Sequence, residues 1–336
     1  MTFRRLGSEG LSVAAIGLGC LSMSDFYGSA SEREGIATIR RALELGIDLL
    51  DTSDAYGPFT NEEIVGKALR GRREHARVCT KFGFRRSREG DWLGLDGSPG
   101  YVREACLGSL RRLGISHIDV YLLHCPDPAV PIEETVGAMA ELVADGVVRF
   151  IGLSNVSPEH VRRAAAVHPI AAVQNDYSLL FREPEQDLLR CLRELGIGFM
   201  AFSPLARGLL TGTVRHPDEL YEGDFRRYLG TFATTNLERN LLLVDRVADV
   251  AARHDATTAQ IALAWLLHQG EDIVPIPGTA RVSRIEENAR AVSIRLTPDE
   301  LALLDDFFPP GVVAGENQWD ADGMTAAIAA RRGARR

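Results

Sequence analysis

The sequence predicts an α/β fold, a (β/α)₈ TIM barrel, from two regularities along the chain. Short apolar runs alternate with stretches in which apolar residues recur at spacings of three and four, a pattern typical of strands that alternate with amphipathic helices. Eight such strand and helix units follow one another at similar intervals. Units in this order form a parallel sheet, and eight parallel strands close into a barrel.

Each predicted strand is short and apolar, and polar residues or Gly stand at its carboxyl end. The strands cover residues 13–19, 47–53, 77–83, 118–125, 148–155, 170–176, 197–204 and 272–278. The helical patterns that follow them cover residues 33–46, 61–71, 101–114, 132–146, 158–168, 185–196, 258–270 and 282–292. Several helices stop at a Gly, the residue that most easily adopts the left-handed conformation of a helix end. These are Gly46, Gly114, Gly146 and Gly196.

Three segments lie outside the eight units. Residues 3–13 predict a β-hairpin before the first barrel strand, because Gly-containing turn chemistry separates two apolar stretches. Residues 84–99 predict a polar loop after the third strand. Residues 206–254, after the seventh strand, are the longest insertion and contain an extra helical pattern. Because long loops at strand carboxyl ends surround the active site of a barrel, we expect residues 84–99 and 206–235, together with the tail 309–336, to contact the substrate.

The chain after the eighth unit predicts one more helix and a tail. The stretch TPDELALLDDFF begins with Thr297 as a helix cap and carries acidic residues in its first turn. We expect residues 1–310 to form a single barrel domain and residues 311–336 to form a C-terminal tail that is either closed over the active-site mouth or mobile. The basic stretch RRGARR ends this tail and is typical of a solvated terminus.

Composition favours a protein that acts on small molecules in the cytoplasm. Hydrophobic residues make up 45% of the chain and charged residues 25%, as in ordinary globular proteins. The net charge of −8 argues against a nucleic-acid partner, whose phosphates require clustered basic side chains. No apolar run is long enough to span a membrane, and the first residues do not resemble a signal peptide. The five cysteines form no CxxC pair, so we expect reduced thiols. The sequence gives no indication of the oligomeric state.

Titratable side chains occur at the predicted carboxyl ends of three successive strands. Asp51 and Tyr56 follow the second strand, Lys81 ends the third and His124 ends the fourth. Lys81 is one of only two lysines in a chain that otherwise uses arginine, the other being Lys67. Each residue alone is compatible with a cap, packing or surface role. Four of them at one barrel mouth instead indicate a catalytic site.

These four residue types together suit acid catalysis. A phenol is a weak acid at neutral pH, and a neighbouring ammonium group makes its proton easier to give. Asp51 is expected to keep Lys81 charged and in place, and His124 to orient a carbonyl oxygen or share the proton. Tyr56 is therefore the predicted general acid. No metal ligand set such as HxH on a strand is present, so we predict no metal, although a metal-dependent barrel hydrolase is the competing barrel enzyme.

Seven ordered motifs resemble the aldo-keto reductase superfamily over residues 3–310. They are DTSDAYG…NEEIVGKAL, TKFG, LLHCPDP, IGLSN, VQNDYSLL, FSPLARGLLTG and PIPGTARVSRIEEN. The wording GPFTNEEIVGKAL and the insertion GDFRRYLGTF…NLERNL look most like the perakine-reductase-like branch. The resemblance implies an NADP-dependent oxidoreductase that reduces aldehydes or ketones to alcohols. It also implies that Asp51, Tyr56, Lys81 and His124 are the catalytic tetrad, with Tyr56 as the proton donor.

The resemblance further implies a set of residues that bind NADP(H). Ser154, Asn155 and Gln174 would hold the nicotinamide carboxamide, and Ser203, Leu205 and Arg207 would approach the diphosphate. The adenosine end would be bound by Gly278, Thr279, Arg284, Glu287 and Asn288. Arg284 matches the position that pairs with the ribose 2′-phosphate, which favours NADP over NAD.

This chain departs from the family pattern at two positions. Phe202 stands where many members stack a tyrosine under the nicotinamide, so the aromatic face is kept without its hydroxyl. Ala280 replaces a basic residue of close relatives, and Arg281 can take over its phosphate contact.

Apolar neighbours of the strand ends are candidates for the substrate cleft. We expect Phe26, Tyr27 and Trp92 to line it, with ordinary packing as the alternative for each.

Three other interpretations compete with a broad carbonyl reductase. The stretch GLGCLS, residues 17–22, looks like a broken dinucleotide fingerprint, but Ser22 replaces its last Gly and the next helix starts only near residue 33. A cofactor-loaded barrel can also serve as a redox-sensing interaction subunit with little turnover. A third interpretation is a narrow ketoreductase for keto sugars or a biosynthetic substrate.

Overall fold

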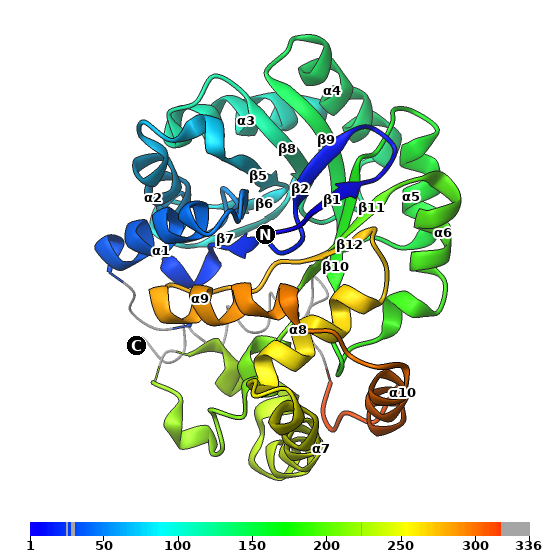
Figure 1. The fold of residues 1–336 in the computed structure, drawn as a ribbon. Coiled ribbons are helices and arrows are strands. Elements are labelled where there is room, and N and C mark those ends of the chain that lie inside the picture. Colours follow the sequence, from blue (N-terminus) through cyan, green and yellow to red (C-terminus); the bar gives the residue numbers. More distant parts are fainter. Residues whose placement is uncertain (25, 28–30, 223, 317–336) are drawn as a thin grey trace.

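The computed structural model describes residues 1–24, 26–27, 31–222 and 224–316, and eight of its strands form one parallel sheet (Figure 1). In chain order these are β3 (Leu18–Gly19), β4 (Leu49–Asp51), β5 (Arg77–Phe82), β8 (Ile118–Leu123), β9 (Val148–Ser154), β10 (Ala172–Asp176), β11 (Gly198–Phe202) and β12 (Ile273–Pro275). Each strand pairs with its predecessor and its successor in this order. A parallel bridge between Gly19 and Gly278 joins the first strand to the segment after the last. The sheet is thus closed, and the predicted (β/α)₈ barrel is confirmed.

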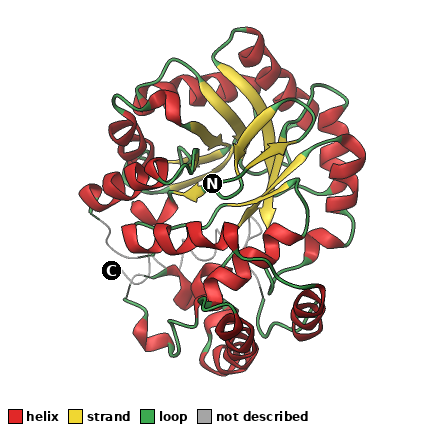
Figure 2. Cartoon of the chain, viewed as in Figure 1, coloured by secondary structure: helices red, strands yellow, loops and turns green. Residues whose placement is uncertain are grey.

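Helices surround the barrel and follow the predicted strand and helix order (Figure 2). They are α1 (Glu32–Glu44), α2 (Thr60–Leu69), α3 (Pro99–Leu113), α4 (Ile132–Ala144), α5 (Pro158–Ala165), α6 (Leu188–Leu195), α8 (Thr258–His268) and α9 (Val282–Arg290). Ser31 and Thr257 cap α1 and α8 with reciprocal hydrogen bonds to the third helical residue, which pair backbone N–H groups that the helix leaves free.

Two further helices confirm the predicted additions to the barrel. The insertion after β11 contains α7 (Thr234–Arg253), and α10 (Pro298–Phe307) follows the last unit. Thr297 caps α10 as expected, because its side chain accepts a hydrogen bond from the Glu300 N–H. Both helices lie beside α8, outside the ring of the other helices (Figure 1). They lie on the side of the molecule from which the long insertion reaches the barrel mouth.

The predicted N-terminal hairpin closes one end of the barrel. Its strands β1 (Phe3–Leu6) and β2 (Leu11–Ala14) pair antiparallel. Leu6 and Leu11 are buried in the same apolar cluster as the interior side chains of the barrel strands, including Met200. Apolar side chains fill this end of the barrel. The polar groups at the strand carboxyl ends therefore lie at the opposite end.

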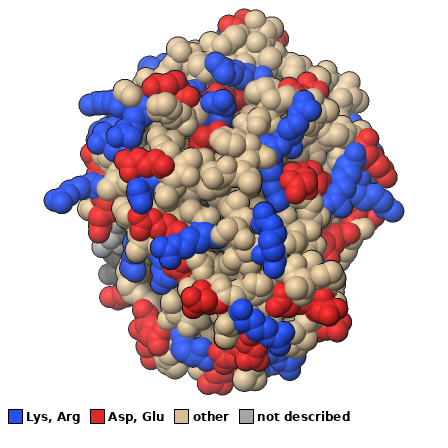
Figure 3. Space-filling view, in the orientation of Figure 1, with Lys and Arg blue, Asp and Glu red and all other residues tan. Residues whose placement is uncertain are grey.

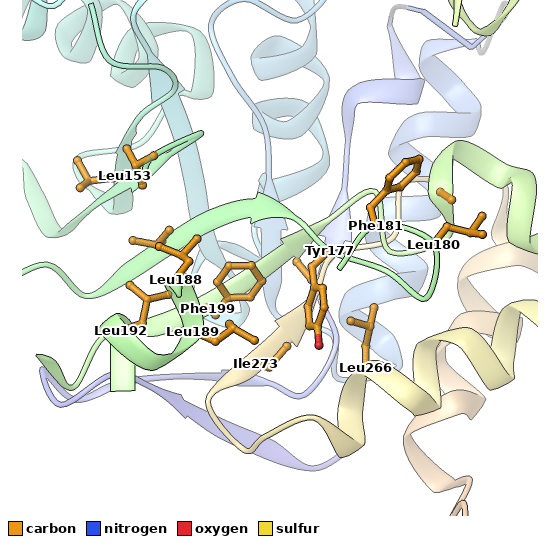
Figure 4. Packing of buried hydrophobic residues seen from close by; sticks show 14 of the residues in the cluster. Leu153, Tyr177, Leu180, Phe181, Leu188, Leu189, Leu192, Phe199, Leu266 and Ile273 are labelled. Atoms are coloured by element: carbon orange, nitrogen blue, oxygen red, sulfur yellow. The ribbon is translucent and has the colours of Figure 1, made fainter. Parts of the chain in front are cut away.

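A second, larger core fills the space between the sheet and the helices. In Figure 4, Leu188 and Leu192 of α6 lie against Phe199 of β11, and Tyr177 and Leu266 continue the cluster towards α8. All five side chains are buried. Each such side chain contributes roughly 1.5–3 kcal/mol through its removal from water. This packing holds the strands, and therefore the residues at their ends, in place.

Two predicted local structures differ from the observed ones. Residues 84–99 are not a plain loop, because β6 (Phe84–Arg86) and β7 (Trp92–Leu95) form a second antiparallel hairpin. Its strands are short, and Arg and Gly interrupt the apolar alternation that predicts a strand. The predicted strand 13–19 is divided between β2 and the two-residue β3.

The dinucleotide-fingerprint interpretation of residues 17–22 is wrong. A short 3-10 turn, Leu21–Met23, follows β3, and α1 begins at Glu32 rather than directly after the strand. The sheet is also a closed barrel with sequential strand order rather than an open doubly wound sheet.

The surface and the cysteines agree with an ordinary globular protein. Acidic and basic side chains are interspersed on the face shown in Figure 3. Within the described ranges, no helix is both long and apolar enough to cross a membrane. The five cysteines are not paired with one another in the structure, and four of them are buried.

Gly152 of β9 is expected to be intolerant of a side chain. A Cβ at this position would lie 2.3 Å from the Ala172 carbonyl oxygen and 2.6 Å from a Leu122 methyl group. Gly152→Ala should therefore lower the free energy of unfolding by about 1–3 kcal/mol. A matched control is Gly137→Ala in α4, where nothing lies within 4 Å of the new methyl group. The control should stabilise by about 0.5–1 kcal/mol in urea unfolding, and equal effects would contradict the packing argument.

Candidate active site

A cleft of about 820 Å³ opens at the carboxyl ends of the barrel strands. Residues at or just after the ends of β3, β4, β8, β9, β10, β11 and β12 line it, together with parts of the insertion after β11. The sequence places polar residues at these positions because the strands themselves must be apolar on both faces. All thirteen predicted cofactor-binding residues line the cleft: Ser154, Asn155, Gln174, Phe202, Ser203, Leu205, Arg207, Gly278, Thr279, Arg281, Arg284, Glu287 and Asn288.

Asp51, Lys81 and Tyr56 form one hydrogen-bonded group beneath the cleft. Lys81 Nζ donates to Asp51 Oδ2 at 2.7 Å, to the Thr52 carbonyl oxygen at 2.9 Å and to Tyr56 Oη at 3.1 Å. Lys81 is fully buried and Asp51 is 4% exposed. Asp51 Oδ1 also accepts a hydrogen bond from Gln174 Nε2 at 2.8 Å. Every contact of the lysine ammonium group therefore serves to hold it beside the phenol.

The charge of Lys81 is secured by its partners. Burial by itself lowers the pKa of Lys81, but the nearby Asp51 and Tyr56 raise it, and the net pKa lies above the ordinary value. Lys81 therefore stays an ammonium group throughout the neutral range. It is the permanent positive charge next to Tyr56 Oη.

Tyr56 differs from the expectation that Lys81 makes its proton easier to give. Burial raises the pKa of Tyr56, the charge of Lys81 lowers it, and the net value rises to about 12. Desolvation outweighs the lysine because the phenolate would be formed away from water. Tyr56 is therefore a protonated phenol at neutral pH, and its proton is present to be donated.

His124 lies beside Tyr56 with its two rings edge to face. The ring centroids are 5.8 Å apart, and the His124 Nδ1 lies 3.2 Å from Ser53 Oγ. Asn155 Nδ2 donates to the His124 carbonyl oxygen at 2.9 Å, which fixes the backbone of the strand end. Burial, and then the charge of Lys81, hold the pKa of His124 well below its usual range. His124 is accordingly a neutral imidazole on the wall of the cleft.

The three predicted substrate residues occupy different positions. Tyr27 lines the cleft, where its ring packs edge to face on Phe225 at 5.1 Å. Phe26 packs on the same Phe225 ring at 5.7 Å, outside the cleft wall. Trp92 of β7 also lies outside that wall. It contacts Phe84 at 4.8 Å, and Phe84 in turn contacts His124 at 4.5 Å. Phe84 is thus the aromatic ring nearest to His124 on this side, and sequence reasoning missed it although it follows TKFG directly.

The backbone after β11 has an unusual conformation where the diphosphate is expected. Ser203, Ala206, Arg207 and Gly208 all have positive φ angles, between 47° and 92°. These residues form a tight turn, in which the Ala206 and Gly208 N–H groups donate to the Ser203 and Leu205 carbonyl oxygens at 2.8 and 2.9 Å. The Arg207 guanidinium itself is paired with Asp176 at 2.9 Å.

The residues expected at the adenosine end form a polar group on α9. Arg284 Nη1 donates to Glu287 Oε2 at 2.7 Å, and Glu287 Oε1 accepts from Thr257 Oγ1 at 2.8 Å. Asn288 is buried behind them, and Arg281 lies just before the helix. Arg284 is therefore oriented by an acidic neighbour at the cleft rim.

Several polar residues of the cleft were not identified from the sequence. Ser22 Oγ is buried at the cleft wall and has no hydrogen-bond partner among the described residues. Asp224 and Arg226, from the insertion, also line the cleft and pair with each other at 2.7 Å. Arg226 stacks over the Tyr27 ring at 5.2 Å, so the insertion meets the segment after β3 across the mouth. Insertions carry no strand periodicity, so the sequence has no regular signal for such contacts.

Two further predictions concern metal ligands and the C-terminal tail. In the part of the chain that the structure describes, no three His, Cys, Asp or Glu side chains are arranged to hold a metal ion. The tail was expected either to close over the active-site mouth or to be mobile, and residues 317–336 of it lie outside the described residues. Its first part packs on the insertion, because Asn240 and Ala314 exchange two hydrogen bonds of 2.8 and 2.9 Å.

Asp54, behind the cleft, supplies a test of the local electrostatics. This carboxyl group is 2% exposed, and burial, then the charge of Glu62, raise its pKa well above the usual range. A folded-state pKa above the unfolded value of about 4 means that wild type loses stability as pH rises from the unfolded towards the folded pKa. Asp54→Asn removes the ionisable group and therefore removes this loss of stability with rising pH. The Tm difference in favour of the variant should therefore grow from pH 5 to pH 8, and a constant difference would contradict the raised pKa.

Comparisons with known proteins agree with the geometry of this site. The aldo/keto reductase family profile matches residues 15–308. The glycerol dehydrogenase AKR11B4 from Gluconobacter oxydans is 29% identical, with a TM-score of 0.84 over 92% of this chain and 96% of its own. The aldo-keto reductase AKR11C1 from Bacillus halodurans, in its holo form, is 31% identical with a TM-score of 0.76 over 92% and 96%. An aldo/keto reductase from Klebsiella pneumoniae in complex with NADP and acetate is 30% identical, with a TM-score of 0.71 over 92% and 95%.

Proposed function

Because the chain belongs to the aldo/keto reductase family, we propose that it reduces aldehyde or ketone carbonyls to alcohols with NADPH. The observation that carries the proposal is the contact of one buried lysine with both Asp51 and Tyr56 Oη under the cleft. A buried ammonium group beside a phenol is costly to maintain and has an evident use in proton transfer.

The residues around the cleft suit NADP(H). Ser154, Asn155 and Gln174 would hold the nicotinamide carboxamide above the face of Phe202. The tight turn of residues 203–208 would lie beside the diphosphate, and Ser22 Oγ, which has no partner among the described residues, offers a donor within the cleft. NADPH, when bound, supplies the hydride that is transferred from its nicotinamide C4 to the carbonyl carbon.

Side chains of the protein would then bind and protonate the carbonyl oxygen of the substrate. Tyr56 donates its proton to that oxygen, and Lys81 stabilises the resulting phenolate across the 3.1 Å contact. Asp51 keeps Lys81 charged and oriented. His124, being neutral, orients the carbonyl through a hydrogen bond rather than through a charge.

The first test is the loss of NADPH absorbance with a panel of aromatic aldehydes, α-dicarbonyls, pyridoxal and keto sugars. Turnover of several classes supports a broad reductase, and turnover of one class supports a narrow ketoreductase. Tight NADPH binding without any turnover would overturn the reductase proposal and favour a redox-sensing subunit. The perakine-reductase-like branch, a cytoplasmic location and a single domain over residues 1–310 stay predictions.

Arg284→Ala is expected to raise the KM for NADPH about tenfold while leaving the KM for NADH nearly unchanged. The reason is the loss of a charge-assisted hydrogen bond to the 2′-phosphate, worth roughly 1.5–3 kcal/mol, which only NADPH carries. Arg290→Ala is the matched control, because Arg290 lies on the same helix and does not line the cleft. Equal changes for the two cofactors would argue against Arg284 as the phosphate ligand.

A further inference from the structure

Ser53 lies between the imidazole of His124 and the carboxyl group of Asp54. Ser53 Oγ is 3.2 Å from His124 Nδ1 and 3.3 Å from Asp54 Oδ1. It also accepts a hydrogen bond from the Ala55 N–H at 3.1 Å, and the Lys81 carbonyl oxygen lies 3.4 Å away. Ser53 and Asp54 are both buried and neither lines the cleft. The Ser53 side chain therefore reaches the cleft through the His124 imidazole.

The neutral imidazole of His124 carries one proton, which can be on either ring nitrogen. Because Nδ1 faces Ser53, Nε2 is the nitrogen left for the cleft. With the proton on Nε2, His124 can donate a hydrogen bond to a carbonyl oxygen. With the proton on Nδ1, a bare Nε2 lone pair would face that oxygen, and two acceptors would repel each other. The tautomer of His124 therefore decides whether it helps or hinders carbonyl binding.

The Ser53 hydroxyl has one proton to give, and its neighbours decide where that proton goes. If Asp54 is ionised, Ser53 donates to Asp54 Oδ1 and must accept the proton of His124 Nδ1. If Asp54 is protonated, Asp54 donates to Ser53 Oγ, and Ser53 donates to His124 Nδ1. The second arrangement leaves the imidazole proton on Nε2.

The surroundings of Asp54 favour its protonated form. The carboxyl group is buried, and the charge of Glu62 opposes its ionisation. Arg112 and hydrogen bonds from Ser53 and the Ala55 N–H favour ionisation, but burial outweighs them and the pKa of Asp54 is raised. Arg112 Nε, however, already donates to Glu62 Oε2 at 2.6 Å, so most of its charge is matched there. The Lys81 carbonyl oxygen, the other acceptor near Ser53, lies further away at 3.4 Å and also receives the Asp54 N–H. With Asp54 protonated, His124 Nδ1, at 3.2 Å, is therefore the nearest acceptor for the Ser53 proton.

We propose that Asp54 and Ser53 are positioning residues that hold the His124 proton on Nε2, so that His124 donates a hydrogen bond to the carbonyl oxygen of the substrate. The contacts run from Asp54 Oδ1 through Ser53 Oγ to His124 Nδ1. The part of the proposal that concerns the carbonyl rests on the proposed function. The tautomer itself does not, and it can be measured in the resting protein.

The test is a ¹⁵N spectrum of the full-length protein labelled at histidine nitrogens, with the His124 signals assigned by their absence from His124→Asn. Wild type should show a bare Nδ1 and a protonated Nε2. In Ser53→Ala the proton should distribute over both nitrogens, and kcat should fall about tenfold, the value of one hydrogen bond, with unchanged NADPH binding. Ser53→Thr, which keeps the hydroxyl, should restore both the spectrum and kcat.

Two further variants separate this hydrogen-bonded chain from a loss of stability. Asp54→Asn can still donate to Ser53 and should keep the wild-type tautomer. Ser178→Ala removes another buried hydroxyl, which accepts from the Phe181 N–H far along the chain, and should leave the His124 spectrum unchanged. A wild-type proton on Nδ1, or an unchanged tautomer in Ser53→Ala, would overturn the inference. Failure of wild type to reduce any carbonyl would instead overturn the proposed function and leave the spectral result standing.

Discussion

Tyr56→Phe is expected to lower kcat for carbonyl reduction by about 10²–10⁴-fold while NADPH binding stays unchanged. The variant removes only the phenolic oxygen that lies 3.1 Å from Lys81 Nζ, and the ring that packs on His124 remains. Because the pKa of Tyr56 rises to about 12, its ionisation should not limit reduction near neutral pH. The measurement is single-turnover reduction of the best aldehyde from the panel, beside fluorescence titration with NADPH.

A control for the general effect of removing a buried phenol oxygen is Tyr121→Phe. Tyr121 is fully buried, and its hydroxyl donates to the Val102 carbonyl oxygen at 3.4 Å, away from the cleft. This variant should keep kcat and change only the stability, by about 1 kcal/mol. Full turnover in Tyr56→Phe would exclude Tyr56 as the proton donor.

Lys81→Met is expected to have the second large effect, on stability and turnover together. It leaves the buried Asp51 carboxylate without its cation, and breaking one partner of a buried ion pair costs about 3–5 kcal/mol. It also removes the charge that stabilises the Tyr56 phenolate, so reduction should be lost. Urea unfolding and NADPH oxidation measure the two effects separately.

The double variant Asp51→Asn/Lys81→Met distinguishes a structural role of Lys81 from a catalytic one. Removal of both charges should restore much of the unfolding free energy, because no unpaired charge stays buried. Turnover should remain lost, because Tyr56 still lacks its ammonium neighbour. Recovery of turnover along with stability would mean that Lys81 acts only in folding.

The sequence predicted the strand ends well because a barrel has strict requirements. Strands buried on both faces must be apolar, so the polar residues that follow them stand out, as Asp51, Lys81 and His124 do. Once eight parallel strands are recognised, their carboxyl ends must meet at one mouth. The cofactor residues were instead predicted from the family resemblance, and Arg284, Glu287 and Asn288 among them lie on α9 rather than at a strand end.

Local features without such a requirement were missed. The hairpin of β6 and β7 has strands of three and four residues, too short for a periodic signal. This hairpin places Phe84 against His124, whereas Trp92 lies one ring further out. The contact of Arg226 with Tyr27 joins residues almost 200 positions apart in the chain, and no local sequence pattern can predict it.

The sequence by itself determined the barrel, the order of its strands and the identity of the residues at its mouth. The reason is that the spacing of apolar residues along the chain shows which positions are buried. Only the tertiary structure decided the chemical state of those residues. Burial raises the pKa of Tyr56 in spite of Lys81, and the surroundings of Ser53 and Asp54 bear on the His124 proton. Desolvation and hydrogen bonding depend on every neighbouring atom in space, and neighbours in space come from distant parts of the chain.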